Sequence, residues 1–289
     1  MAVWRQYGQA ELDAQFTLDS IDNLDALFAR RAEAAERARA TLPHRAGLRY
    51  GPGPAETLDF YPSSSPGPWP LLVFIHGGFW RSLDARSFAF VAEGYVGQGV
   101  AVAVLDYPLI PDVRLDDIVE SCRRAVTWLH GHAESLGCDP SAIFVSGNSA
   151  GGHLVAELME RTWPATHAVP ELVIAGGCAI SGLFELEPVR RSAQNATLRF
   201  TPEEAERRSP ARRVGRGAPL LVSVGGAEAE EFIRQSQDFA AAWAEAGNRA
   251  ELVIPAGADH ITVVLDEFAV PESRLNAAMV TLIREGREG

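Results

Sequence analysis

A serine lies between small residues at the end of an apolar run. Residues 144–153 read FVSGNSAGGH, which places Ser149 in a Gly-x-Ser-x-Gly pattern between a short apolar run and a segment of helical composition. A serine on such a tight strand-to-helix turn faces open space, and its strained backbone leaves little room for side chains two residues away. The pattern predicts Ser149 as a nucleophile, although an ordinary glycine-rich loop can carry the same pentapeptide.

A second glycine motif, HGGFW at residues 76–80, comes directly after the apolar run 71–75. Acyl transfer from a serine passes through an intermediate with a negatively charged oxygen, and each preorganised amide donor lowers that barrier by about 3 kcal/mol. We expect the backbone amides of Gly78, Phe79 and Ala150 to form this oxyanion hole. A plain glycine turn would account for the motif alone, but not for the serine turn as well.

A serine nucleophile needs a base, and histidine has a suitable pKa. Of the seven histidines, His260 follows the last apolar run in the loop PAGADH, where a sheet of this type brings a residue over the nucleophile. His76 and His153 belong to the two motifs above, and we expect them to orient the backbone through hydrogen bonds. Surface or structural roles are expected for His44, His130, His132 and His167.

The base in turn needs a carboxylate that fixes its tautomer and stabilises the imidazolium. The segment VSVGGAEAEEFIRQ offers Glu228, Glu230 and Glu231 after the apolar run 220–224. Glu228 is favoured because it comes first in the turn, whereas Glu230 and Glu231 suit the first turn of a helix, where a carboxylate complements the dipole. Asp259 is disfavoured because adjacent residues rarely point at each other.

The elements that must position these residues follow from the apolar pattern. Six short runs rich in branched residues occur at 71–75, 100–105, 143–145, 172–175, 220–224 and 252–254. The runs are continuous rather than alternating, which is typical of strands covered on both faces. Helical segments separate them, so we expect an α/β fold with a mostly parallel central sheet and helices on both faces. Ligands of such sheets bind at the carboxyl ends of the strands, where the candidate residues stand.

Two regions depart from this alternation. Residues 1–45 are expected to form an N-terminal helical extension, with a helix running to about residue 40 whose narrow apolar stripe consists of Ile21, Leu24, Leu27 and Phe28. Residues 46–289 then form the main domain, with an early strand at 57–61. Within it, residues 181–216 are an insertion at the active end of the sheet and a candidate cap over the pocket.

Composition excludes several classes of function. The net charge of −12 disfavours a nucleic-acid or membrane-surface partner, because such binding needs a basic surface. There is no lysine, and the arginine-rich stretch 29–40 interleaves Glu with Arg at spacings that predict intrahelical pairs on a solvated face. Without a signal peptide or an apolar span, a cytoplasmic protein is expected. A homodimer stays open, since the N-terminal stripe could pack on the domain or on a partner.

The cysteines Cys122, Cys138 and Cys178 lack the spacing of a zinc site or a disulfide framework, so buried thiols are expected.

From about Arg49 onward the sequence resembles the α/β-hydrolase superfamily, and within it the kynurenine formamidase (arylformamidase) group. The matching residues are the HGGxW motif at 76–80, Tyr107 with Pro111, the run Ser149 to His153, and Glu231-Phe232 with Gln235-Ser236. The Trp of the motif distinguishes this group from the HGGG esterases of the hormone-sensitive lipase type. The group commonly has aspartate where Glu228 stands, and often histidine where Asn148 stands.

The resemblance implies a serine hydrolase that removes an N-formyl group from an aromatic amine, such as N-formylkynurenine, through an acyl-serine intermediate and without a cofactor. Trp80 and Asn148 are expected to bind substrate, although Phe79 and Trp80 could instead pack under the cap. Three alternatives stay open: a carboxylesterase of broad scope, an amidase for another N-acyl aromatic substrate, and a non-catalytic receptor on the same fold.

Overall fold

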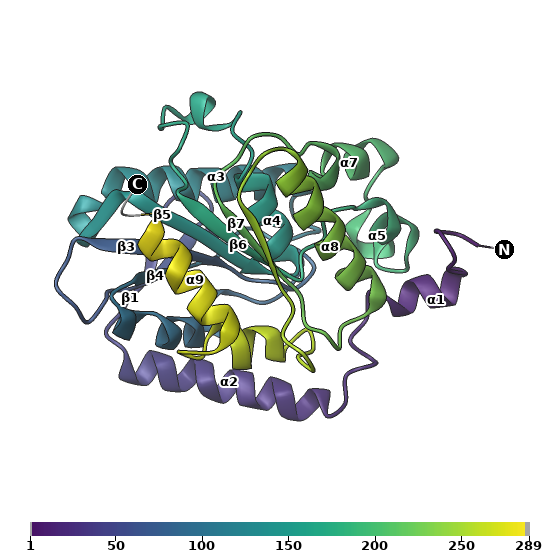
Figure 1. The fold of residues 1–289 in the computed structure, drawn as a ribbon, viewed down its shortest axis with the longest axis horizontal. Coiled ribbons are helices and arrows are strands. Elements are labelled where there is room, and N and C mark those ends of the chain that lie inside the picture. The colour runs from purple at the N-terminus through teal and green to yellow at the C-terminus, as the bar shows by residue number, and fades with distance from the viewer. Residues whose placement is uncertain (1, 287–289) are drawn as a thin grey trace.

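The centre of the molecule is an eight-stranded sheet with the spatial order β1-β2-β4-β3-β5-β6-β7-β8 (Figure 1). The computed structural model describes residues 2–286. β2 pairs antiparallel with β1 and β4, and all other neighbouring strands run parallel. The strands are β1 (Arg45–Arg49), β2 (Thr57–Tyr61), β3 (Trp69–Ile75), β4 (Ala101–Leu105), β5 (Cys138–Asn148), β6 (Gly176–Ile180), β7 (Leu220–Ser223) and β8 (Ala250–Val253).

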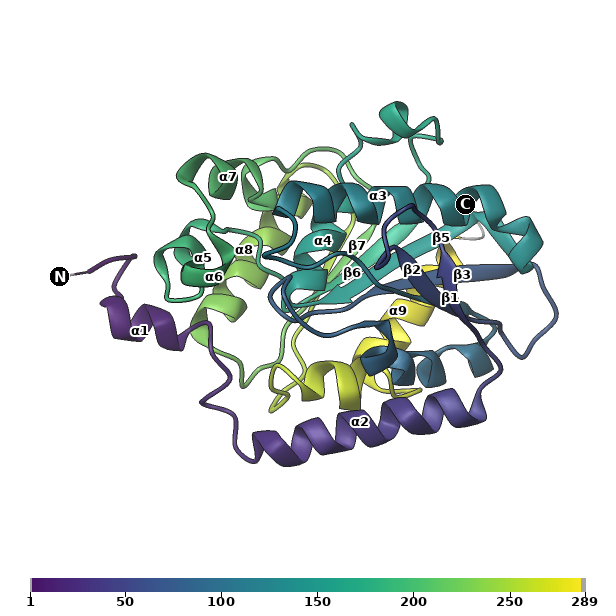
Figure 2. The same ribbon diagram turned by 180° about the vertical axis from the view of Figure 1, so that it is seen from behind.

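Helices cover both faces of the sheet, as Figures 1 and 2 show. They are α1 (Gln9–Ala14), α2 (Leu24–Thr41), α3 (Leu115–His132), α4 (Ala150–Leu158), α5 (Glu187–Arg191), α6 (Asn195–Leu198), α7 (Pro202–Arg207), α8 (Glu230–Glu245) and α9 (Arg274–Glu285). α3, α4 and α8 lie on one face, and α2 and α9 lie on the other. The predicted α/β architecture is confirmed.

The central strand β3 is continuously apolar because helices cover both of its faces. Leu71, Val73 and Ile75 enter the core beneath α3 and α4, whereas Leu72 and Phe74 enter the core on the side of α2 and α9. Both sets are fully buried. A strand with two covered faces has no position at which a polar side chain would reach water, so the alternation typical of a half-exposed strand disappears.

One predicted strand is misplaced. The branched run 172–175 precedes the strand, and β6 instead begins at Gly176 and Gly177, which pair with Phe144 and Val145 of β5. A Cβ at Gly177 would lie 3.1 Å from the carbonyl oxygen of Val145. Close packing against neighbouring groups therefore favours glycine in this strand, and glycine carries no apolar pattern.

The helix α2 runs along one outer side of the molecule (Figure 2). Its buried residues are Ala34, Ala35 and Ala38, while the predicted stripe residues Leu24 and Phe28 are only partly buried. Charge pairing within the helix is limited, among the described residues, to an interaction between Glu33 and Arg37. The ion pairs at bonding distance join α2 to other elements, and they are Arg30–Asp266, Arg37–Glu93, Arg39–Asp59 and Arg86–Glu36.

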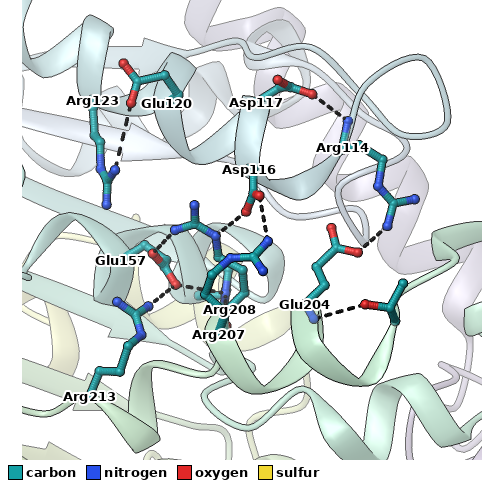
Figure 3. Close-up of polar contacts among 12 residues, drawn as sticks. Arg114, Asp116, Asp117, Glu120, Arg123, Glu157, Glu204, Arg207, Arg208 and Arg213 are labelled. Carbon is teal, nitrogen blue, oxygen red and sulfur yellow. Dashed lines mark hydrogen bonds and ion pairs between the residues drawn. The ribbon is translucent and has the colours of Figure 1, made fainter.

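Charge pairs fasten the inserted segment 181–216 to the helical layer (Figure 3). The buried carboxylate of Glu157 on α4 accepts hydrogen bonds from Arg208 at 2.9 Å and Arg213 at 2.5 Å. Asp116 on α3 binds Arg207 and Arg208. Burial raises the pKa of Glu157, and the neighbouring arginines oppose that change. The insertion is thus tied to both α3 and α4 by ion pairs that are partly withdrawn from water.

The cysteines Cys122, Cys138 and Cys178 are free and buried, as the sequence predicted. Burial raises the pKa of Cys138 to about 12, so its thiol stays protonated at neutral pH. Among residues 2–286, no helix has the length and apolarity of a membrane span.

His153 gives a testable pH dependence of stability. Burial lowers its pKa to about 3, while its Nε2–H donates to the Arg208 carbonyl at 2.8 Å. The unfolded chain takes up a proton near pH 6.5 and the folded chain does not, so acidification destabilises the fold. Between pH 7 and pH 5 this one group should remove about 2 kcal/mol from the free energy of unfolding.

Urea unfolding at both pH values would measure this for the wild type and for His153→Gln. The variant is expected to be less stable at pH 7 but to lose about 2 kcal/mol less on acidification. Equal pH dependence in the two proteins would show that His153 titrates normally in the fold.

Candidate active site

Ser149 occupies the turn between β5 and α4 with φ 59° and ψ −118°. Space around this turn is very limited. A Cβ at Gly151 would lie 2.0 Å from the carbonyl oxygen of Ile75, and one at Gly147 would lie 2.6 Å from backbone atoms of Gly151. The glycines on either side of the serine are therefore required by backbone contacts, which is the physical reason for the Gly-x-Ser-x-Gly spacing.

Glu228 and His260 form a hydrogen-bonded pair at the ends of β7 and β8. His260 Nδ1–H donates to Glu228 Oε2 at 2.5 Å. This bond fixes the tautomer and leaves Nε2 of the ring without a proton, in the state that can accept one. His260 and Ser149 line the same cavity of about 270 Å³, and Glu228 lies behind His260 with its side chain 1% exposed.

The second carboxylate oxygen of Glu228 also accepts hydrogen bonds. Oε1 accepts a hydrogen bond from the Gly225 amide at 2.7 Å and from the Ser181 hydroxyl at 2.5 Å. Ser181 follows β6 directly and has a positive φ of 49°. Sequence reasoning did not select Ser181 as a site residue, although its position after a strand is the same signal that singled out Ser149 and Glu228.

The other acidic candidates have different partners. Glu230 Oε2 accepts a hydrogen bond from the Tyr7 hydroxyl at 2.8 Å. Glu231 pairs with Arg234. Asp259 accepts from the backbone amides of two residues that follow it. Among these carboxylates, Glu228 is the one in contact with the His260 ring.

The glycine loop after β3 turns sharply into the cavity. Gly78, Phe79 and Trp80 all have positive φ, and a Cβ at Gly78 would lie 2.2 Å from the carbonyl oxygen of Ser82. Within residues 2–286, no acceptor takes a hydrogen bond from the amides of Gly78, Phe79 or Ala150. These three donors are thus unoccupied beside Ser149, as an oxyanion hole requires.

His76 and Tyr107 hold this loop through ring stacking and hydrogen bonds to its backbone. Their rings stack with centroids 4.2 Å apart, and the Tyr107 hydroxyl donates to the His76 carbonyl at 2.9 Å. His76 Nδ1–H donates to the Gly77 carbonyl at 2.7 Å. Burial lowers the pKa of His76 to about 4, so the ring is neutral at physiological pH and acts through its hydrogen bond.

The wall of the cavity differs from the expected one. Leu18, Phe28 and Arg31 from the N-terminal extension line it, whereas no residue of the inserted segment 181–216 does. Phe79 and Asn148 also line the cavity, and the buried Nδ2 of Asn148 has no hydrogen-bond partner in the described part of the chain.

Trp80 lies elsewhere than predicted for a substrate-binding residue. It is fully buried, it is not among the cavity residues, and it packs edge-on against His153 and Phe200. Phe200 belongs to the inserted segment. The left-handed turn at Phe79 and Trp80 sends one ring toward the cavity and the other under the insertion, which the sequence pattern could not distinguish.

Glu228→Gln tests the pair with His260. The amide keeps the shape of the side chain but removes the negative charge that stabilises the imidazolium, so we expect kcat to fall by about 10³- to 10⁴-fold. Glu230→Gln is the matched control, because Glu230 contacts Tyr7 instead. Steady-state hydrolysis of 4-nitrophenyl acetate reports both. Comparable losses in the two variants would contradict the assignment of Glu228.

Ser181→Ala tests the second support of the carboxylate. Loss of one hydrogen bond to a charged group should lower kcat by about tenfold while KM stays near the wild-type value. Ser181→Thr, which keeps a hydroxyl, is expected to recover part of the rate. A Ser181→Ala enzyme with unchanged kcat would show that Gly225 alone is sufficient to hold Glu228.

Comparison with known proteins places this geometry in a family. The family model BD-FAE matches residues 58–162. A protein from Danio rerio named kynurenine formamidase is 27% identical over 278 residues, which cover 91% of this chain and 93% of the relative. A solved structure from Silicibacter sp. TM1040, provisionally named a thioesterase, is 33% identical with a TM-score of 0.81 and covers 93% of this chain and 98% of its own.

An esterase from Pyrobaculum calidifontis is 19% identical with a TM-score of 0.71, covering 91% of this chain and 92% of its own, and it shares the fold. The described sheet, with its mostly parallel order and flanking helices, agrees with these similarities. The chain therefore belongs to the α/β-hydrolase superfamily, as a hydrolase of the kynurenine formamidase-like esterase and amidase group.

Proposed function

We propose that this protein is a serine hydrolase that removes an N-formyl group from an aromatic amine of the N-formylkynurenine type. The observation that carries the proposal is the hydrogen bond from His260 to Glu228, because His260 lines the same cavity as Ser149, beside backbone amides that have no acceptor within residues 2–286. The similarity to kynurenine formamidases supports the formyl substrate over other acyl groups.

In the proposed reaction His260 Nε2 takes the proton from the Ser149 hydroxyl, and the serine oxygen attacks the formyl carbon. The negative oxygen of the intermediate accepts hydrogen bonds from the amides of Gly78, Phe79 and Ala150. His260 then gives its proton to the departing amine nitrogen, because an arylamine leaves far more readily in protonated form. Water attacks the formyl-serine by the same steps and releases formate.

The cavity suits a single substituted aromatic ring. A cavity of roughly 150 Å³ already accommodates benzene, and the space here is about 270 Å³. The rings of Phe28, Phe79 and Phe88 form part of its wall. The Nδ2 of Asn148 supplies a donor without a protein partner, which we propose contacts a substrate carbonyl.

We propose that residues 1–45 complete the substrate cavity of a hydrolase domain over residues 46–289, since Leu18, Phe28 and Arg31 line it. The role of residues 181–216 in this proposal is indirect: Phe200 packs on Trp80, next to the loop of the amide donors. A cytoplasmic location stays a prediction of the sequence.

The activity test compares N-formylkynurenine with 4-nitrophenyl acetate, using the wild type and Ser149→Ala. We expect efficient cleavage of the formamide, and a loss of about 10³-fold or more on both substrates in the variant. Ester cleavage without formamide cleavage would instead indicate a carboxylesterase or an amidase for another acyl group, because an amide needs protonation of its nitrogen and an activated ester does not. Undiminished activity of Ser149→Ala would contradict the serine mechanism.

A further inference from the structure

Arg31 is a cation on the wall of the active-site cavity, and aromatic rings lie against it. Its guanidinium carbon lies 5.0 Å from the ring centroid of Phe28 and 5.4 Å from that of Phe88. Both rings line the same cavity. Within residues 2–286, no hydrogen bond or ion pair joins Arg31 to a carboxylate, so aromatic contacts hold it in place.

The neighbouring arginines of α2 behave differently. Arg30 pairs with Asp266, Arg37 pairs with Glu93, and Arg39 pairs with Asp59. Arg31 thus stands apart on a helix whose other described arginines reach carboxylates on other elements.

Partial burial without an ion pair has an energetic cost for Arg31. Desolvation lowers the pKa of Arg31, and the charge of Asp84 opposes that change only in part. The carboxylate of Asp84 is itself engaged, since its Oδ1 accepts from the Ser87 amide at 2.9 Å and from the Ser87 hydroxyl at 2.5 Å. A half-buried cation that has lost part of its hydration and forms no ion pair within residues 2–286 is a site at which an anionic ligand compensates the lost hydration.

The charge of the cavity wall is positive although the chain carries a net charge of −12. Arg31 and Arg81 both line the cavity, and no Asp or Glu of the described residues does. Arg81 is already held, because its Nη2 donates to Gln194 Oε1 at 2.8 Å. A local excess of cations in a concave site attracts anions.

We propose that Arg31 is the residue that binds the carboxylate on the leaving-group side of the substrate. This inference rests on the proposed function and assigns recognition of the substrate carboxylate to one residue of this chain. The planar guanidinium can donate two parallel hydrogen bonds to a carboxylate, and the aromatic rings beside it limit its freedom before binding. Arg31 is thus a specificity-determining residue supplied by the N-terminal extension.

A purely structural role is the competing explanation. Arg31 could serve only to join α2 to the 3₁₀ helix at Ala85–Gly94, which contains Phe88. That role predicts that a change at Arg31 alters all substrates alike, whereas carboxylate binding predicts a change confined to charged substrates.

The experiment compares N-formylkynurenine with its methyl ester, which differs in the loss of one negative charge. The variants are Arg31→Met, which keeps the apolar contacts without the charge, and Arg31→Lys, which keeps the charge without the planar group. Arg30→Met is the matched control, because Arg30 pairs with Asp266 and lies outside the cavity wall.

For the acid, Arg31→Met should lower kcat/KM by about 10- to 100-fold, mainly through KM, and it should leave the methyl ester within about threefold of the wild type. Arg31→Lys should recover part of the loss, and Arg30→Met should match the wild type on both substrates. Equal losses on the acid and the ester, or no loss on either, would overturn the proposal.

Failure of the proposed function has a different signature. If the wild type hydrolyses 4-nitrophenyl acetate but neither formamide, the formyl substrate is wrong, and the role of Arg31 is then measured by competitive inhibition of ester hydrolysis. Kynurenine should inhibit at least tenfold more tightly than kynurenine methyl ester, and Arg31→Met should abolish that difference. Equal inhibition by the two compounds in the wild type would overturn carboxylate binding by Arg31.

Discussion

The hydrogen bond between Glu228 and His260 depends on the parallel register of four neighbouring strands. Ser149 follows β5, Ser181 follows β6, Glu228 follows β7 and His260 follows β8. These strands are consecutive neighbours in the sheet, so their carboxyl ends meet at one edge. The last three of these strands contribute the chain of hydrogen bonds from Ser181 through Glu228 to His260, and Ser149 lines the same cavity as His260. The sheet therefore sets the relative positions of the side chains in the site.

The site is assembled from backbone conformations that are unfavourable in isolation. Phe79, Trp80, Ser149 and Ser181 all have positive φ without being glycine. Such residues persist when the surrounding contacts over-determine them, and they concentrate at functional sites. Here the contacts are the close-packed glycines beside Ser149, the stacked rings of His76 and Tyr107, and the Ser181 hydroxyl on Glu228. The ion pairs in Figure 3 hold the inserted segment whose Phe200 covers Trp80.

The sequence could predict the sheet and the order of the polar side chains, because both follow local rules about strands and turns. The strand β6, which begins with two glycines, lies a few residues after its predicted position. Its start depends on close contacts with the neighbouring strands, and the apolar pattern of its own side chains does not indicate it. The residues that line the cavity could not be predicted for a related reason. Phe28 and Arg31 reach the site because α2 packs on the 3₁₀ helix at Ala85–Gly94, and nothing in the local pattern of residues 21–40 indicates that contact.

The central claim is that Ser149 is the nucleophile whose reactivity depends on the Glu228–His260 pair. A fluorophosphonate probe reacts covalently with activated serines, and mass spectrometry of the digested protein identifies the modified residue. Our account predicts one probe molecule per chain, attached to the peptide that contains Ser149, with labelling of Glu228→Gln at least 100-fold slower. Labelling of a different residue, or equally fast labelling in that variant, would contradict it.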